Sequence, residues 1–260
     1  MTTHKPYADD VELALSIAHE AGRLLHDYFG HTTMEMKGEN EVVTEADRAS
    51  EKLIARRLSQ SRPHDALIAE EGTTLIGDGT RKWVVDPLDG TNNFAHGFWA
   101  YAVSIALLEN DELVVGVVHA PEMNQTFAAV KGHGATLNGQ PLHVSATAVL
   151  ANAVCATGFP YARRTLSRNN LAEFQRVIMA VQGMRRVGSA ALDLCWTAAG
   201  RFDGYWELHL KPWDVAAGIL ICREAGGRVT NLEGGAVDLE QPHIVATNGL
   251  IHDELLALLR

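Results

Sequence analysis

The sequence predicts a mixed α/β fold, and three patterns carry this prediction. Short apolar runs bounded by Gly and Pro indicate buried strands, amphipathic stretches indicate helices, and the two kinds of element alternate after Leu150. Such alternation is typical of layered α/β domains. The 260 residues contain no repeat, low-complexity tract or long linker. We therefore expect one domain over residues 1–260, with approximate halves 1–150 and 151–260.

The first half is expected to begin with helices and to end in an antiparallel meander. Apolar spacing predicts a helix over Asp9–Phe29 and a second from Thr44 through Leu58, and the polar stretch Gly38–Glu41 between them indicates a mobile loop. The expected strands are Ala66–Ala69, Val84–Val85, Tyr101–Leu108, Leu113–His119 and Thr126–Val130.

The second half is expected to alternate strands and helices. Its last predicted helix follows Asp214 and consists of small and aliphatic residues, which indicates burial, until the glycine pair Gly226–Gly227 ends it. The elements expected before it are the strands Ala153–Thr157, Met184–Val187 and Phe202–Leu208 and the helices Asn169–Ala180 and Ala190–Ala199.

Composition narrows the class of protein. A net charge of −10 argues against nucleic-acid binding, which needs a basic face. No apolar run approaches the roughly 18 residues that span a membrane, and the N-terminus lacks the layout of a secretory signal. Cys155, Cys195 and Cys222 lie far apart in apolar settings, as buried thiols of a reducing compartment do. We therefore expect a cytoplasmic enzyme with no membrane or nucleic-acid partner.

The segment Asp86-Pro87-Leu88-Asp89-Gly90-Thr91 carries the strongest chemical signal. The apolar run before it delivers Asp86 to the end of a strand, and Asp89 follows three residues later. Carboxylates are hard ligands suited to Mg²⁺ or Mn²⁺. Gly90 lets backbone N–H groups approach an anion, especially where a helix begins. Taken alone, an ordinary Asp-rich turn also accounts for this segment.

Glu70 ends another short apolar run, just before Glu71-Gly72. If the two runs are neighbouring strands, Glu70 and Asp86 emerge at the same edge, where ligands of open α/β sheets gather. A Glu pair before Gly is, by itself, more typical of a solvated loop.

Two further aspartates fit both a structural and a chemical interpretation. Asp214 stands at the start of a buried helix, where it can serve as an N-cap or as a metal carboxylate. Thr44 and Asp47 fit the N-cap and N3 positions of a capping box, although Asp47 also suits a catalytic role. The local pattern does not decide between these interpretations.

In combination and in this order, these segments resemble the inositol monophosphatase family of Mg²⁺-dependent, lithium-sensitive phosphatases, in its bacterial form. The resemblance covers nearly the whole chain and implies a layered αβαβα sandwich of the inositol monophosphatase and fructose-1,6-bisphosphatase type, and a homodimer. Further matching segments are Lys37-Gly38, Gly158-Phe159-Pro160-Tyr161, Gly188 to Leu194 and Tyr205-Trp206-Glu207.

The resemblance implies two to three Mg²⁺ ions, with Mn²⁺ as a substitute. Glu70, Asp86 and the main-chain carbonyl of Leu88 would hold the first ion. Asp86, Asp89 and Asp214 would hold the second, so that Asp86 bridges the pair. A weaker third ion is expected near Glu70. Two ions of this kind stabilise the attacking and leaving oxygens of an in-line displacement.

The family roles also cover the attack on phosphate. Glu70 and the Thr91 hydroxyl are expected to orient and deprotonate a water, while Asp47 accepts a hydrogen bond from Thr91. Asn92 stands where the family often has a second Thr. Lys37 is expected either to close a loop over the site or to be an ordinary solvated lysine. The residues expected at the substrate are Asp89, Gly90, Thr91, Ser189, Ala190, Glu207 and Asp214.

The expected substrate is a small phosphorylated polyol, most closely myo-inositol 1-phosphate, because the segments Gly188 to Leu194 and Trp206 to Leu208 resemble the inositol branch of the family. Glu207 matches the family residue that contacts inositol hydroxyls. Histidinol-phosphate, fructose-1,6-bisphosphate and 3′-nucleotide phosphatases share the metal site and stay open as alternatives. The aspartyl-phosphate phosphatases do not fit, because two residues separate Asp86 and Asp89 where that class has one. A regulatory or binding protein on this fold is a further alternative. Arg185 and Arg186 are interpreted as surface residues rather than as guides for an anionic substrate.

Overall fold

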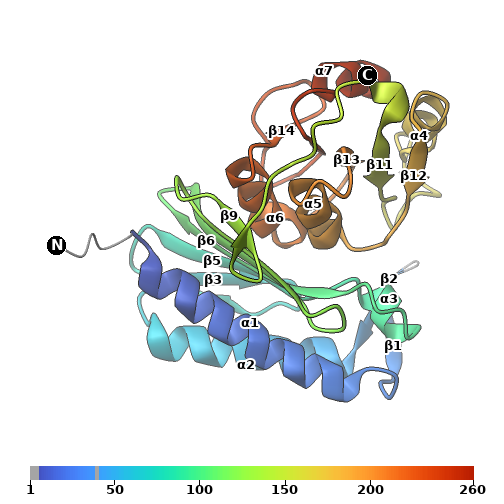
Figure 1. Ribbon diagram of the computed structural model, residues 1–260. Coiled ribbons are helices and arrows are strands. Elements are labelled where there is room, and N and C mark those ends of the chain that lie inside the picture. The colour runs from blue at the N-terminus through green and yellow to red at the C-terminus, as the bar shows by residue number, and fades with distance from the viewer. Residues whose placement is uncertain (1–5, 39–40) are drawn as a thin grey trace.

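The computed structural model, which describes residues 6–38 and 41–260, has five layers in the order helix, sheet, helix, sheet, helix (Figure 1). The helices of these layers are α1 (Ala8–Tyr28), α2 (Glu45–Ser61), α4 (Leu171–Ile178), α5 (Ala190–Ala198), α6 (Pro212–Glu224) and α7 (His252–Leu259). Helices α1 and α2 cover one face of the large sheet, α5 and α6 lie between the two sheets, and α4 and α7 cover the outer face of the small sheet (Figure 1). The expected αβαβα sandwich is confirmed.

The large sheet contains eight strands in the order β10-β9-β8-β7-β6-β5-β3-β4. They are β3 (Ala66–Ala69), β4 (Thr74–Leu75), β5 (Arg81–Asp89), β6 (Ala102–Glu109), β7 (Glu112–Ala120), β8 (Gln125–Val130), β9 (Ala135–Leu137) and β10 (Gln140–Pro141). Strands β5 to β8 pair antiparallel, which confirms the expected meander.

The parallel pair β3–β5 sets up the candidate site. Ala69 lies opposite Val85, and the Glu70 N–H donates to the Val85 carbonyl over 3.3 Å. Because parallel strands end at the same edge, Glu70 lies beside Asp86, as the sequence predicts.

The small sheet has the order β12-β11-β13-β15-β14. Its strands are β11 (Val154–Thr157), β12 (Gly183–Arg185), β13 (Gly204–Glu207), β14 (Arg228–Thr230) and β15 (Ile244–Thr247). Strand β11 pairs in parallel with β12 and β13, whereas β15 pairs antiparallel with β13 and β14.

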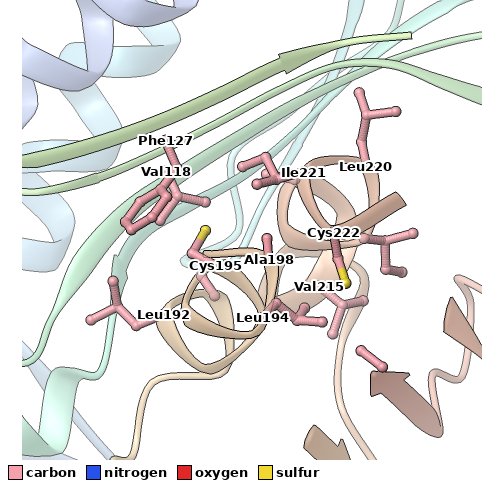
Figure 2. Packing of buried hydrophobic residues seen from close by; sticks show 14 of the residues in the cluster. Val118, Phe127, Leu192, Leu194, Cys195, Ala198, Val215, Leu220, Ile221 and Cys222 are labelled. Carbon is pink, nitrogen blue, oxygen red and sulfur yellow. The ribbon is translucent and has the colours of Figure 1, made fainter. Parts of the chain in front are cut away.

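The core between the sheets explains why α5 and α6 consist of small and aliphatic residues. All of α5 and residues Val215–Cys222 of α6 are buried, so neither helix has the continuous polar face of a surface helix. Figure 2 shows Val118 and Phe127 of the large sheet lying over Cys195 of α5. A fully buried aliphatic or aromatic side chain contributes about 1.5–3 kcal/mol to folding. Cys155, Cys195 and Cys222 are all buried and unpaired, as expected.

The prediction of a mobile loop over Gly38–Glu41 is partly wrong. Gly38 and Glu41 belong to an antiparallel pair of strands, β1 (Met34–Gly38) and β2 (Glu41–Thr44). The other two residues of that expected loop, Glu39 and Asn40, lie outside the described residues. Across the described part of the chain, no helix is both long and apolar enough to cross a membrane.

Candidate active site

A cavity of about 370 Å³ opens beside the ends of β3 and β5 and reaches the start of α5 and α6. This volume suits a small ligand. Acidic and basic side chains both line the cavity. The acidic ones are Glu41, Glu70, Asp86, Asp89, Glu207 and Asp214, and the basic ones are Lys37, Arg186 and Lys211.

A bulge in β5 brings two aspartates to this cavity. Residues three apart on a regular strand point to opposite faces, yet both Asp86 and Asp89 line the cavity. Pairing with β6 is interrupted between them, where Pro87 has no N–H to donate. The Leu88 N–H donates to Asp86 Oδ1 over 3.0 Å and fixes that carboxylate.

Gly90 and the short helix α3 (Thr91–Ala95) follow directly. Gly90 has φ +90°, a left-handed conformation that favours glycine, and a Cβ there would lie 2.9 Å from the Ala100 carbonyl oxygen. A helix therefore does begin directly after Gly90, the condition under which the sequence favours an anion site here. Backbone N–H groups at such a start are suited to binding an anion such as phosphate.

Thr91 and Asp47 are hydrogen-bonded across the site. Thr91 Oγ1 lies 2.9 Å from Asp47 Oδ1 and 2.9 Å from the Leu88 carbonyl oxygen. The other oxygen of Asp47 accepts from the Thr44 N–H over 2.8 Å and from its hydroxyl over 2.6 Å. The capping box and the expected bond to Thr91 are thus both present. Burial raises the pKa of Asp47, although these hydrogen bonds oppose the increase.

Asp214 reaches the cavity from the first turn of α6. Its Oδ2 accepts from the Lys211 N–H over 2.7 Å. The N-cap is Lys211 and Asp214 occupies N3, so the expectation of an N-cap aspartate is wrong by three positions. The reason is Pro212, which begins the helix because a proline suits its first turn.

Asp89 is held by the start of α5. Ser189 is the N-cap of that helix, and its hydroxyl donates to Asp89 Oδ2, which also accepts from the Ala191 N–H over 2.9 Å. This contact joins the large sheet to the helical layer and brings Ser189 and Ala190 to the cavity wall.

The acidic cluster resists full ionisation. Burial raises the pKa of Glu70 to about 7 and that of Asp89 to about 6. Burial, reinforced by repulsion among the neighbouring carboxylates, raises the pKa of Asp86 and Asp214 well above the ordinary value. Oxygen donors of this kind and density suit Mg²⁺ or Mn²⁺, whose charge offsets the repulsion.

The described side chains are not arranged around a cation. No three His, Cys, Asp or Glu side chains among the described residues converge at ligand spacing. Glu70 and Asp86 follow the last paired residues of the strands β3 and β5, and the charge of Glu70 contributes to the raised pKa of Asp86. The donor chemistry, clustered carboxylate oxygens, nevertheless fits a divalent cation.

The other expected substrate residue, Glu207, lines the cavity from the end of β13. Its Oε2 accepts from the Tyr205 hydroxyl over 2.8 Å. Burial raises the pKa of Glu207 to about 7, against the effects of that hydrogen bond and of Arg186.

Every residue that the sequence analysis assigned to metal, catalysis or substrate except Asp47 lines this cavity. Asp47 lies behind Thr91, with no exposed surface. The site therefore combines segments far apart in the sequence: β3, β5, α3, α5, β13 and α6.

The comparison with known proteins agrees with this geometry. The model of the inositol monophosphatase family matches residues 8–260. The chain belongs to that family. It is 41% identical to the inositol-1-monophosphatase of Mesorhizobium japonicum over 250 residues, which is 95% of this chain and 94% of the relative.

A second group of relatives carries another name. The Nus factor SuhB of Pasteurella multocida is also 41% identical over 250 residues, covering 95% of this chain and 94% of that protein. The crystal structure of the extragenic suppressor protein suhB from Bartonella henselae superposes with a TM-score of 0.92 at 41% identity, covering 97% of this chain and 99% of that one.

Part of the positive charge around the cavity of this inositol monophosphatase family member was not predicted from its sequence. Arg185 and Arg186 are both exposed, as expected, but Arg186 also lines the cavity, whereas Arg185 donates to the Met184 carbonyl over 3.0 Å. Lys37 also lines the cavity, with Nζ 3.0 Å from Glu71 and 3.9 Å from Glu70. Lys211 was overlooked, although its place before the Pro212-Trp213-Asp214 motif was a usable signal.

Proposed function

We propose that this protein hydrolyses small phosphate monoesters with Mg²⁺, and that myo-inositol 1-phosphate is its preferred substrate. The observation that carries the proposal is the set of four carboxylates, Glu70, Asp86, Asp89 and Asp214, around one cavity beside the Gly90–Thr91 helix start. A phosphate monoester is a stable dianion, so its hydrolysis requires both charge neutralisation and a positioned water.

The donor set divides between two cations. Glu70, Asp86 and the Leu88 carbonyl would hold one, and Asp86, Asp89 and Asp214 the other, with a weaker third ion near Glu70. When bound, divalent ions supply charge neutralisation and acidify water. Mn²⁺ has the same preference for oxygen ligands and should substitute.

The chain's own groups then orient and deprotonate the attacking water. Glu70 lines the cavity at the end of β3, and its carboxylate is suited to orient the water and to accept its proton. The Thr91 hydroxyl donates toward Asp47, which leaves its oxygen lone pairs directed elsewhere for the water's proton. The Gly90 and Thr91 N–H groups border the cavity and are suited to hold the phosphate.

The leaving group would be recognised by Glu207, Ser189 and Ala190, which also line the cavity. Glu207 is a carboxylate, which accepts hydrogen bonds from adjacent hydroxyls without donating any when ionised. Ser189 and Ala190 line the cavity beside Asp89 and offer further polyol contacts. This arrangement favours a polyol over a leaving group without hydroxyls.

The name Nus factor for some relatives raises a second candidate, a role in a regulatory complex. For this chain we favour the phosphatase, because all four metal carboxylates are present, whereas a net charge of −10 argues against direct contact with nucleic acid. The two roles are compatible, since a surface for a protein partner leaves the cavity unchanged.

We also propose that two copies associate. Phe98 and Trp99, just beyond α3, are 43% and 48% exposed, and their ring centroids lie 5.0 Å apart. An exposed aromatic pair of this kind marks an interaction surface. Light scattering should give twice the 28.3 kDa of one chain, and the double variant Phe98→Ser, Trp99→Ser should give a single chain.

The direct test is phosphate release from a panel of inositol 1-phosphate, histidinol phosphate, fructose 1,6-bisphosphate and a 3′,5′-bisphosphonucleoside, with Mg²⁺ and with or without lithium. We expect Mg²⁺-dependent turnover, preference for inositol 1-phosphate and inhibition by lithium. Preference for another member of the panel would retain the metal chemistry and refute the polyol assignment of Glu207. Absence of turnover on every substrate would refute the phosphatase.

A further inference from the structure

We infer that Gly158 is a positioning residue that sets leaving-group selectivity, because it provides the space in which the Glu207 carboxylate lies. The inference rests on the proposed function of the cavity. It concerns how Glu207 is held, and it assigns a role to the buried glycine that follows β11.

The Glu207 carboxylate packs directly on the Cα atom of Gly158. A Cβ at residue 158 would overlap three atoms of the side chain, Oε2, Oε1 and Cδ of Glu207. These are the three nearest atoms to that position, so an alanine would first meet the far end of a side chain. The space at Gly158 therefore limits Glu207 and leaves the backbone fold untouched.

Buried hydrogen bonds prevent the backbone of Gly158 from moving away. Asn170 Nδ2 donates to the Gly158 carbonyl over 2.6 Å and to Thr157 Oγ1 over 2.8 Å. Asn170 Oδ1 in turn accepts from Trp206 Nε1 over 2.6 Å, and Thr157 Oγ1 donates to the Trp206 carbonyl over 2.6 Å. Asn170, Thr157 and Trp206 have no exposed surface. Because this network joins β11 to β13, the clash is relieved by the carboxylate and not by the backbone.

Glu207 is held from a second side. Its Oε2 accepts from the buried Tyr205 hydroxyl over 2.8 Å. A glycine on one side and a hydroxyl donor on the other fix the direction in which the carboxylate offers its lone pairs to the cavity. A leaving group with hydroxyls benefits from that direction, and one without them does not.

The test compares two substrates in the variant Gly158→Ala with Mg²⁺ present. The displaced Glu207 carboxylate would lose its hydrogen bonds to the substrate hydroxyls. Because hydrogen bonds to charged groups are strong, kcat/KM for inositol 1-phosphate should fall on the order of 10- to 100-fold. For phenyl phosphate, whose leaving group has no neighbouring hydroxyl, kcat/KM should fall far less. The ratio of the two values is the readout, because a general loss of structure lowers both equally.

Two further variants make the test specific. Gly183→Ala, on the adjacent strand β12, is the matched control because the nearest atom to its Cβ is the Arg185 side chain at 3.4 Å, and it should leave the ratio unchanged. Shortening the acid in the double variant Gly158→Ala, Glu207→Asp should relieve the overlap. The fold-decrease in kcat/KM for inositol 1-phosphate in the double variant should therefore be smaller than the product of the fold-decreases in the two single variants.

An unchanged ratio in Gly158→Ala, or an equal fall for both substrates, would overturn the inference and leave the proposed function intact. Multiplicative losses in the double variant would likewise overturn it. If the wild-type protein hydrolyses neither substrate with Mg²⁺, the proposed function fails, and the role of Gly158 fails with it.

Discussion

The Thr91 hydroxyl lies 2.9 Å from Asp47 Oδ1, and this contact joins the first turn of α2 to the first turn of α3. Both oxygens of Asp47 are in use, since Oδ2 accepts two hydrogen bonds from Thr44. One aspartate therefore caps a helix and orients a hydroxyl at the cavity. Structural and chemical roles coincide at this residue, which is why local sequence could not separate them.

Replacing Asp47 with Asn should slow turnover more than it weakens substrate binding. The amide NH₂ would face donors from Thr44 or from Thr91, so the hydroxyl of Thr91 would lose its fixed direction. We expect kcat to fall about 100-fold, with KM changed only a few-fold and about 1 kcal/mol of stability lost. Steady-state kinetics and thermal melting measure these effects.

The control for that variant is Glu45→Gln, an exposed position in the same helical turn. It should leave both kinetic constants unchanged. A fall in kcat of Asp47→Asn no larger than that of Glu45→Gln would rule out a role for Asp47 at the site.

Gly90→Ala should damage both stability and activity. A side chain at φ +90° is strained, and its Cβ would also lie 2.9 Å from the Ala100 carbonyl oxygen. Gly97→Ala is the matched control, because Gly97 has φ +69° with no atom within 4 Å of its Cβ. Strain alone costs about 1–2 kcal/mol, so chemical denaturation should show a clearly larger loss for Gly90→Ala. Equal losses would mean that the contact with Ala100 is unimportant.

Mg²⁺ should stabilise the folded protein. Four neighbouring carboxylates repel one another, and a cation bound only by the folded state relieves that repulsion. At a concentration 100 times the dissociation constant the gain is about 2.7 kcal/mol. Thermal unfolding with MgCl₂ should therefore occur at a higher temperature than with EDTA and NaCl of matched ionic strength. Identical melting temperatures would argue against a metal site.

Acid should destabilise the protein through its buried histidines. Burial lowers the pKa of His119 to about 4, and its Nδ1 lies 2.9 Å from Thr126 Oγ1. The unfolded chain takes up a proton below its ordinary pKa of about 6.5, while folded His119 does not. Its contribution to stability is complete above pH 6.5 and falls as the pH decreases toward 4, by up to about 1.4 kcal/mol per unit.

Urea unfolding at several pH values measures this effect by difference. His119→Gln should show a weaker loss of stability between pH 6.5 and pH 4 than the wild type, whereas His133→Gln, at an exposed position, should show the wild-type slope. His252, which is buried between Thr230 and Thr247 and whose pKa is also lowered to about 4, should behave as His119 does. Parallel slopes in all these proteins would contradict the assignment.

Much of the fold was predictable because its signals are local. Antiparallel strands joined by tight turns, such as β6 and β7 with Asn110 and Asp111 at positive φ, leave a clear pattern in consecutive residues. Asp214 occupies N3 because Pro212 begins the helix. The proline is visible in the sequence, so the helix start could have been placed correctly from local chemistry alone. Strands β14 and β15 were missed because they are short and their burial comes from distant elements.

The residues of the candidate site likewise include some that a local sequence pattern indicates and some that only contacts between distant segments bring to the cavity. Asp86 and Asp89 were recognised from spacing, although only the bulge at Pro87 explains how both reach one cavity. Arg186 could not be placed, because Arg185 beside it has the same charge and only the path of the chain after β12 decides which of them faces the cavity. The space that Gly158 leaves for Glu207 depends on a contact between two strands and leaves no trace in either segment alone.

The most direct measurement is the Mg²⁺ dependence of inositol 1-phosphate hydrolysis in Asp86→Asn, beside the wild type and Asp27→Asn, an exposed aspartate of α1. Asp86 is assigned to both cations, so its loss should lower kcat at least about 1,000-fold, and raising the Mg²⁺ concentration should not restore it. Asp27→Asn should match the wild type. Wild-type turnover and an unchanged Mg²⁺ requirement in Asp86→Asn would contradict the assignment of the four carboxylates as the metal site.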